Sequence, residues 1–210
     1  MTEADQIEGL FPIPLMRCPG LLGPEKVAAA LESIRSARIE KNLRSDQLFH
    51  TEIGDPRSDQ LFAEIAALAI PKLADFGMLL FGERLNWVVK EMWTNMLEPG
   101  GSQALHSHAN SFASGVFYLT PSHPGSRTVF VRPPGGFEFN FRHHTRAAQM
   151  GPFNAGKFVV PVAEPGDLIL FPSYLYHEVP RNPGEVRVTV ALNAIPDRLD
   201  CWGYRINFTP

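Results

Sequence analysis

The sequence has few of the features that mark secreted, membrane or nucleic-acid-binding proteins. Only two of its 210 residues are cysteines, Cys18 and Cys201, which are too few for a disulfide framework and form no CxxC pair. No apolar run reaches the roughly 18 residues of a membrane-spanning helix, and residues 1–7 lack an apolar signal core. A net charge of −3 argues against a general nucleic-acid surface, which needs clustered Lys and Arg. We therefore expect a cytoplasmic protein with neither a membrane nor a nucleic-acid partner.

Proline, by contrast, is abundant. The chain has 19 prolines, about 9% of its residues against a typical ~5%. Proline is disfavoured inside helices and central strands, so this content indicates many turns and short elements. The length and the hydrophobic share of 44% fit one globular domain over residues 1–210. We divide it into a helical part, about 1–84, and a β-rich part, about 85–210.

Two helices are expected in the first part. Between Pro24 and Lys41, apolar residues recur at helical spacing, and proline suits the first helical position. A second helix is expected to begin near Asp59 and to continue past Phe76. Pro71 lies inside it, and we expect a kink or a split there because proline cannot donate the intrahelical hydrogen bond.

The second part consists of short runs rich in β-branched and aromatic residues, broken by Gly and Pro. The expected strands are 86–97, 103–108, 113–120, 127–132, 157–162, 167–171, 175–180 and 185–195. Such strands after two helices predict an α+β, mainly β fold, a jelly roll braced by the N-terminal helices. The segment 133–156 has little periodicity and is long for a connector, which favours a lid or binding loop.

Three of the seven histidines stand in two strand contexts. His106 and His108 are two residues apart in one expected strand, so their side chains point to the same face. His177 belongs to a distant expected strand, which a jelly roll can fold onto the other side. An isolated histidine is more often a structural hydrogen-bonding residue, but two imidazoles on one face need a common reason. We interpret His106, His108 and His177 as a candidate metal site.

Arg187 is the second unusual feature. It lies in a cleanly alternating strand, and Thr189 follows on the same face. A charge inside a sheet is costly unless it is paired, and neither Val186 nor Val188 is a partner. If Arg187 points into the barrel, its planar guanidinium is suited to a ligand carboxylate. In the alternative, it points to solvent while the valines point inward, and alternation alone does not separate the two.

These residues belong to an ordered series of short motifs. In chain order the motifs are Pro99-Gly100-Gly101, His106-Ser107-His108, the run Ser114 to Leu119, the run Gly166 to Ser173, His177-Glu178-Val179 and Arg187-Val188-Thr189. Their order and spacing, from Trp93 to Asn193, resemble the 2-oxoglutarate/Fe(II) oxygenase superfamily, particularly its prolyl-hydroxylase-like branch. Within that branch the chain is similar to a group of uncharacterised bacterial proteins.

The resemblance implies a double-stranded β-helix with Fe(II) and 2-oxoglutarate as cofactors. It implies that His106 and His177 bind the iron. Arg187, with Thr189 and Tyr118, would bind the distal carboxylate of 2-oxoglutarate. The implied activity is that of a 2-oxoglutarate-dependent dioxygenase, a hydroxylase of a small-molecule or peptide substrate that the sequence does not identify.

The sequence departs from the family pattern at the third iron ligand. The family usually has Asp or Glu two residues after the first histidine, and here that residue is His108. Three explanations are open: a three-histidine site, a two-histidine site with water or Asn110 in the third position, or an inactive relative. Other acids fit poorly, because Glu178 should face away from His177 and Asp167 follows a turn. We favour His108 as the third ligand.

Two competing functions use the same fold in other ways. A cupin-like metal-binding protein or isomerase would not use 2-oxoglutarate and would have no need of a buried Arg187. A catalytically inactive sensor of a small acid is favoured only by His108 in the place of a carboxylate. In segment 133–156, His143 and His144 are candidate substrate contacts, although loop histidines are usually solvated. Gln103 is a weaker candidate for a cosubstrate contact.

Overall fold

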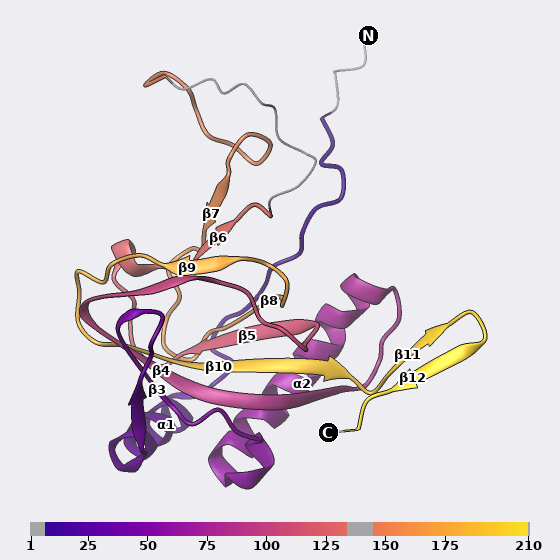
Figure 1. Cartoon of the computed structure of the whole chain (residues 1–210), viewed down its shortest axis with the longest axis horizontal. Coiled ribbons are helices and arrows are strands. Elements are labelled where there is room, and N and C mark those ends of the chain that lie inside the picture. Colours follow the sequence, from indigo (N-terminus) through magenta and orange to yellow (C-terminus); the bar gives the residue numbers. More distant parts are fainter. Residues whose placement is uncertain (1–6, 134–144, 210) are drawn as a thin grey trace.

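The computed structural model of the chain describes residues 7–133 and 145–209. A curled antiparallel sheet forms a half-open barrel, and two helices lie against one of its faces (Figure 1). This arrangement confirms the mainly β jelly roll braced by helices. None of the described helices has the length and apolar character that crossing a membrane requires.

Most of the helical residues come early in the chain, and most of the strands follow them. The helices are α1 (Pro24–Ser36) and α2 (Gln60–Phe81), and the 3-10 turns are η1 (Pro56–Ser58) and η2 (Pro124–Ser126). The strands are β1 (Met16–Cys18), β2 (Ile39–Lys41), β3 (Asp46–Thr51), β4 (Trp87–His106), β5 (Ala113–Tyr118), β6 (Val129–Val131), β7 (Lys157–Val159), β8 (Leu168–Pro172), β9 (His177–Val179), β10 (Arg187–Pro196), β11 (Arg198–Cys201) and β12 (Tyr204–Asn207).

Strand β4 connects the two layers of the barrel. Its residues 87–97 pair with β10 and its residues 95–102 with β3 in the larger layer, whose order is β1-β8-β5-β10-β4-β3-β2. Gly100, in the middle of β4, has a φ of 81°, and beyond it the strand pairs with β9 in the smaller layer, β4-β9-β6-β7. In this second layer His106 and His177 are direct cross-strand partners. The long strand therefore brings two of the three histidines together.

Strand β10 is buried on both faces. Its residues Val188, Val190 and Leu192 pack in the core that includes both helices. The alternate residues face the concave side of the barrel, where Arg187 is only 4% exposed. The structure therefore excludes the alternative in which Arg187 points to solvent.

Several elements differ from the sequence-based expectations. Helix α1 ends at Ser36 rather than Lys41, because residues 39–41 form β2, and β1 and β3 also lie in the part expected to be helical. Asp59 caps α2, its side chain accepting from the backbone N–H of Phe62 at 2.9 Å. Helix α2 is not split at Pro71. Pro71 and Ala67 are exposed, so water can bind the Ala67 carbonyl that the proline leaves without a donor.

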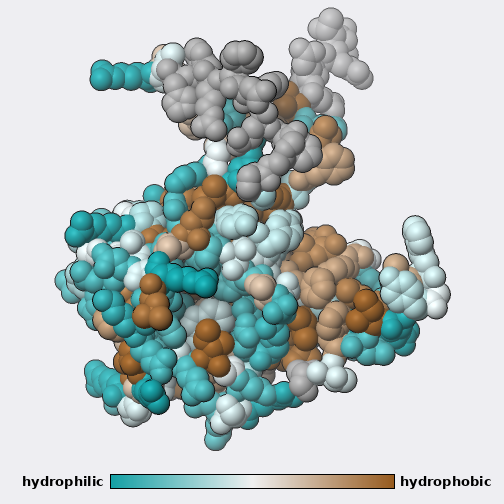
Figure 2. Space-filling view, in the orientation of Figure 1, coloured by the Kyte–Doolittle hydropathy of each residue, from teal (hydrophilic) through white to brown (hydrophobic). Residues whose placement is uncertain are grey.

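Apolar side chains gather over the C-terminal end of α2, beside the projecting β11–β12 hairpin (Figures 1 and 2). Met78, Leu79 and Phe81 are exposed there. The hairpin was not expected from the sequence. Its two-residue turn, Trp202-Gly203, has positive φ at both positions, a geometry that two-residue hairpin loops favour. This surface lies apart from the smaller layer of the barrel.

Gly166 is a position where the backbone tolerates no side chain. It has a φ of 96°, and a Cβ there would lie 2.3 Å from the carbonyl oxygen of Leu22. We expect Gly166→Ala to lower the free energy of unfolding by about 2–4 kcal/mol, from backbone strain and the clash together. Urea unfolding measures this. The control Gly156→Ala has open space at its Cβ, so a similar loss in both variants would contradict the prediction.

Candidate metal centre

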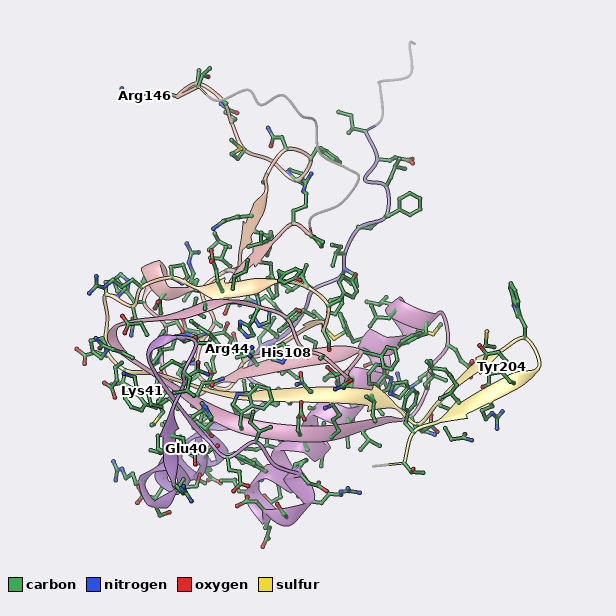
Figure 3. All side chains as sticks on the ribbon, in the orientation of Figure 1. Glu40, Lys41, Arg44, His108, Arg146 and Tyr204 are labelled. Atoms are coloured by element: carbon green, nitrogen blue, oxygen red, sulfur yellow. The ribbon has the colours of Figure 1, made fainter. Side chains whose placement is uncertain are left out.

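The three histidines singled out in the sequence converge in the structure. His106 ends β4, His177 begins β9, and His108 follows β4 by two residues. Each offers a ring nitrogen, and these atoms all lie within 4.8 Å of one another. The Nε2 atoms of His108 and His177 are 3.3 Å apart. Figure 3 shows His108 between the two layers of the barrel. In the part of the chain that the structure describes, this is the group of ligand-type side chains that could hold a metal ion.

Backbone carbonyl groups orient two of the three rings. The Nδ1 of His106 lies 2.8 Å from the carbonyl oxygen of Ala104, and the Nδ1 of His177 lies 3.0 Å from that of Leu175. A carbonyl oxygen only accepts, so each Nδ1 carries the hydrogen and each Nε2 keeps a free lone pair. Two ligand atoms are thus set in the form that binds a metal.

His108 is held mainly by its backbone and by ring packing. Its N–H donates to the carbonyl oxygen of Ser173 at 2.9 Å. The ring lies 5.8 Å from the ring of Trp93 and 6.4 Å from that of Phe171, between centroids. Trp93 was expected to be a core residue and is buried, but it also forms a wall of this site.

Burial keeps the cluster neutral. It lowers the pKa of His106, and it lowers the pKa of His108 to about 4, with the neighbouring His106 adding to the effect. Burial and the charge of His106 likewise lower the pKa of His177 to about 3. All three imidazoles are therefore unprotonated near neutral pH, which metal coordination requires.

The other candidates for the third ligand lie elsewhere. Asp167 accepts hydrogen bonds from the backbone N–H groups of Gly20 and Glu164, at 2.8 and 3.1 Å. Glu178 pairs with Lys157 at 2.6 Å on the outer side of β9. Asn110 is exposed. Of the residues considered for this position, only His108 joins the cluster.

Arg187 lies in a buried pocket of polar groups on the concave face. Its guanidinium carbon is 5.1 Å from the centre of the Tyr118 ring, and its Nη2 donates to the Thr128 hydroxyl at 3.3 Å. The Tyr118 hydroxyl is 3.2 Å from the same Thr128 oxygen. Thr189, also buried, is the cross-strand partner of Tyr118. Among the described residues, the Nε of Arg187 has no partner.

This pocket has the features of an anion site. A buried guanidinium is costly without a counter-charge, and within residues 7–133 and 145–209 no carboxylate forms an ion pair with Arg187. A ligand carboxylate would supply that charge and take up the free donors. Sequence reasoning missed Thr128, because its neighbours in sequence carry no motif. Only the folding of the smaller layer, which contains β6, over the larger layer brings Thr128 to Arg187.

Gln103 reaches the same centre from β4. Its side-chain nitrogen lies 3.4 Å from the Nε2 of His106, on the side where that lone pair points. His143 and His144 lie outside the described residues. Arg146, which follows them, lies far from His108 in Figure 3.

The segment that carries these side chains matches a known family. Residues 91–193 match the model of a family described as "Putative 2OG-Fe(II) oxygenase". This segment of the chain belongs to the 2OG-Fe(II) oxygenase family. The matched segment contains all three clustered histidines, Arg187 and its neighbours in the polar pocket. No curated protein matches the sequence.

Several solved structures share the fold. HygX from Streptomyces hygroscopicus, crystallised with nickel and 2-oxoglutarate, superposes with a TM-score of 0.63 at 15% identity, covering 88% of this chain and 83% of HygX. SnoN, a non-heme alpha-ketoglutarate-dependent epimerase from nogalamycin biosynthesis, gives 0.64 at 13%, covering 89% and 80%. A prolyl-4-hydroxylase of Pseudomonas putida gives 0.57 at 18%, covering 86% and 92%. At these identities the likeness establishes the fold.

The lowered pKa values predict how the metal-free protein responds to acid. The pKa of His108 falls from 6.5 to about 4 on folding, so between these values the unfolded chain binds more protons than the folded one. His108 therefore makes its full contribution to the free energy of unfolding above about pH 6.5. That contribution falls by about 3 kcal/mol as the pH drops toward 4. His106 and His177 act in the same direction.

Urea unfolding at several pH values, with a chelator present, measures this dependence. His108→Asn cannot be protonated and should show a shallower fall between pH 6.5 and 4. The exposed His123→Asn, which can still accept the N–H of Gly125, is the control and should follow the parent. If His108→Asn also followed the parent, protonation of His108 would not contribute.

Proposed function

We propose that this oxygenase binds Fe(II) through His106, His108 and His177 and acts as a hydroxylase. The convergence of three neutral imidazoles on one point carries the proposal, and imidazole is a good ligand for iron. Two of the rings present a fixed Nε2 lone pair, and burial keeps all three unprotonated. His108 takes the place that a carboxylate has in the usual facial triad.

We further propose that Arg187 binds the distal carboxylate of 2-oxoglutarate, with Thr189 and Tyr118 beside it. The buried guanidinium without an acidic partner among the described residues supports this role. Thr128, which contacts both Arg187 and Tyr118, would position the two groups. A cupin-like protein that does not use a keto acid would leave this pocket without a counter-charge, which favours the oxygenase.

The chain's own side chains set up the environment of the reaction. When bound, Fe(II) with 2-oxoglutarate supplies the oxygen-activating chemistry. Phe130 and Phe171 pack around His177, with ring centroids at 5.7 and 4.8 Å, and exclude water from that side. Three neutral ligands leave the full charge of the metal in place, and the dianionic cosubstrate can balance it. We therefore expect metal and cosubstrate binding to be strongly coupled.

The substrate is proposed to be a small molecule or a peptide. HygX has been crystallised with the small molecule hygromycin B, and the Pseudomonas putida relative is a prolyl-4-hydroxylase. The helices share one core with the larger sheet, so we propose one domain over residues 1–210. Iron analysis of the purified protein, followed by assay of 2-oxoglutarate-dependent succinate formation, tests the activity. Retained cofactor binding without succinate would favour an inactive sensor.

Replacing Arg187 tests the cosubstrate site. Arg187→Leu should abolish measurable 2-oxoglutarate binding in the Mn²⁺-loaded protein and leave Mn²⁺ affinity largely unchanged, because Arg187 is not a member of the histidine cluster. A buried charge-assisted contact of this kind contributes on the order of 3 kcal/mol or more, over 100-fold in affinity.

Anaerobic titration calorimetry provides both affinities. Arg38→Leu is the matched control, since Arg38 is exposed and pairs only with Glu40 in the described part of the chain. Unchanged 2-oxoglutarate affinity in Arg187→Leu would rule out the proposed anchor.

Replacing His108 tests the third ligand. His108→Ala should weaken Mn²⁺ or Fe(II) binding by more than about 100-fold. Even the loss of a side chain that only hydrogen-bonds to a ligand typically weakens metal affinity by about 10–100-fold. His108→Asp, which restores the usual ligand type of the family, should retain binding where the shorter side chain reaches the metal. The control His123→Asn should bind like the parent. Parent-like affinity in His108→Ala would favour the two-histidine site.

A further inference from the structure

A β-bulge places a pair of opposite charges beside the candidate metal centre. On β4, Glu91 is opposite Asn193 of β10, and Val89 is opposite the next residue, Ala194. Lys90 is therefore the inserted residue of the bulge. A bulge interrupts the alternation of side chains and re-aims them. Consequently the two successive side chains meet, with Lys90 Nζ 2.8 Å from Glu91 Oε2.

The carboxylate of Glu91 lies on the concave face of the barrel. Its cross-strand partner Asn193 and Trp93, two residues along β4, share that face. Trp93 forms a wall of the His108 site. The negative charge of Glu91 raises the pKa of His108 and the positive charge of Lys90 lowers it, with Glu91 having the larger influence. Burial opposes ionisation of Glu91, but hydrogen bonds from Lys90 and Asn193 outweigh it and lower its pKa.

A buried network fixes this carboxylate relative to His108. Asn193 Nδ2 donates to Glu91 Oε1 at 2.6 Å, and Ser114 Oγ donates to Asn193 Oδ1 at 2.6 Å. Ser114 Oγ is 2.8 Å from Ser173 Oγ, and the Ser173 carbonyl accepts the N–H of His108. Asn193, Ser114 and Ser173 are all buried. The position of Glu91 is thus coupled to the backbone that carries His108.

The need for such a charge follows from the ligand set. A facial triad with a carboxylate contributes one negative charge to the metal, whereas three neutral imidazoles contribute none. Opposite charges that do not touch still attract in a partly buried site, where screening by water is weaker. In the described structure, Asp167 and Glu178 are engaged elsewhere, which leaves Glu91 as the carboxylate that acts on His108.

We propose that Glu91 is an outer-sphere carboxylate of this centre, which stabilises the bound cation through space in place of a ligand carboxylate. Asn193 and Ser114 position it, and Lys90 moderates its effect. The inference rests on the proposed metal site. It assigns Glu91 a positioning and electrostatic role without contact to the reacting atoms.

Two substitutions, each of which removes one charge of the pair, test this inference, because they are expected to change Mn²⁺ affinity in opposite directions. Glu91→Gln keeps the shape and an oxygen that can accept from Asn193, and it should weaken Mn²⁺ binding roughly tenfold. Lys90→Met removes the opposing charge and should strengthen binding severalfold. Both effects should shrink in 1 M salt, because exposed parts of the pair are screened. Titration calorimetry gives the affinities, and thermal unfolding of the metal-free variants is measured alongside.

The outcomes separate the inference from the metal site on which it rests. Opposite, salt-sensitive shifts without a matching change in unfolding temperature would support the electrostatic role. If His106→Ala abolished Mn²⁺ binding while Glu91→Gln and Lys90→Met both bound like the parent, the metal site would stand and the inference would be wrong. Shifts in the same direction, accompanied by loss of stability, would indicate a purely structural pair and would also overturn it. A parent that binds no Mn²⁺ would overturn both proposals.

Discussion

The pairing of β4 with β10 is the interaction on which the rest of the molecule depends. Over this ladder, alternate residues of β10 face the helices or the concave side, and both sets are buried. The helix-facing set, Val188, Val190 and Leu192, forms core with α1 and α2. The other set presents Arg187 to its polar pocket and Asn193 to Glu91. A slip of one residue would exchange the two sets, burying Arg187 in the apolar core and removing it from the pocket. Fold stability and site geometry therefore share one register.

The sequence was sufficient for most strands of the barrel, because they are short, rich in β-branched residues and separated by Gly and Pro. It divided β4 into two strands and did not indicate the β11–β12 hairpin. The spacing of His106 and His108 implied that their side chains share one face of a strand. The order of the motifs implied that His177 lies close to them in the fold. Local patterns could not decide the direction of Arg187, since both faces of β10 are buried and both alternatives satisfy the alternation. Burial of the guanidinium, which only the folded chain reveals, decides it.

The missed features share a physical reason: tertiary neighbours, not local sequence, determine them. Strand β2 has only three residues and forms because β3 pairs with it. Its sequence carries no strand signal of its own, so the sequence-based prediction extended the preceding helix to Lys41. Pro71 fits in an unbroken α2 because the affected turn faces solvent. Thr128 becomes part of the pocket only when β6 lies beside the larger layer. The bulge at Lys90 has no sequence signature, and it appears only in the register with Asn193.

In the proposed metal centre, charges outside the ligand set would take the role of the usual carboxylate ligand. The three imidazoles are neutral and contribute no negative charge, and Arg187 adds a positive charge on the same concave side. A dianionic keto acid held at Arg187 would supply the negative charge that the three neutral histidines do not. The fold alone does not dictate the reaction, since SnoN, which shares it, is an epimerase. The proposed centre combines His108 with the fixed carboxylate of Glu91. In the usual site of this family, a carboxylate bound directly to the metal supplies negative charge. In the proposed centre, the negative charge of Glu91 would act from behind the ligands, and the three histidine ligands would remain neutral.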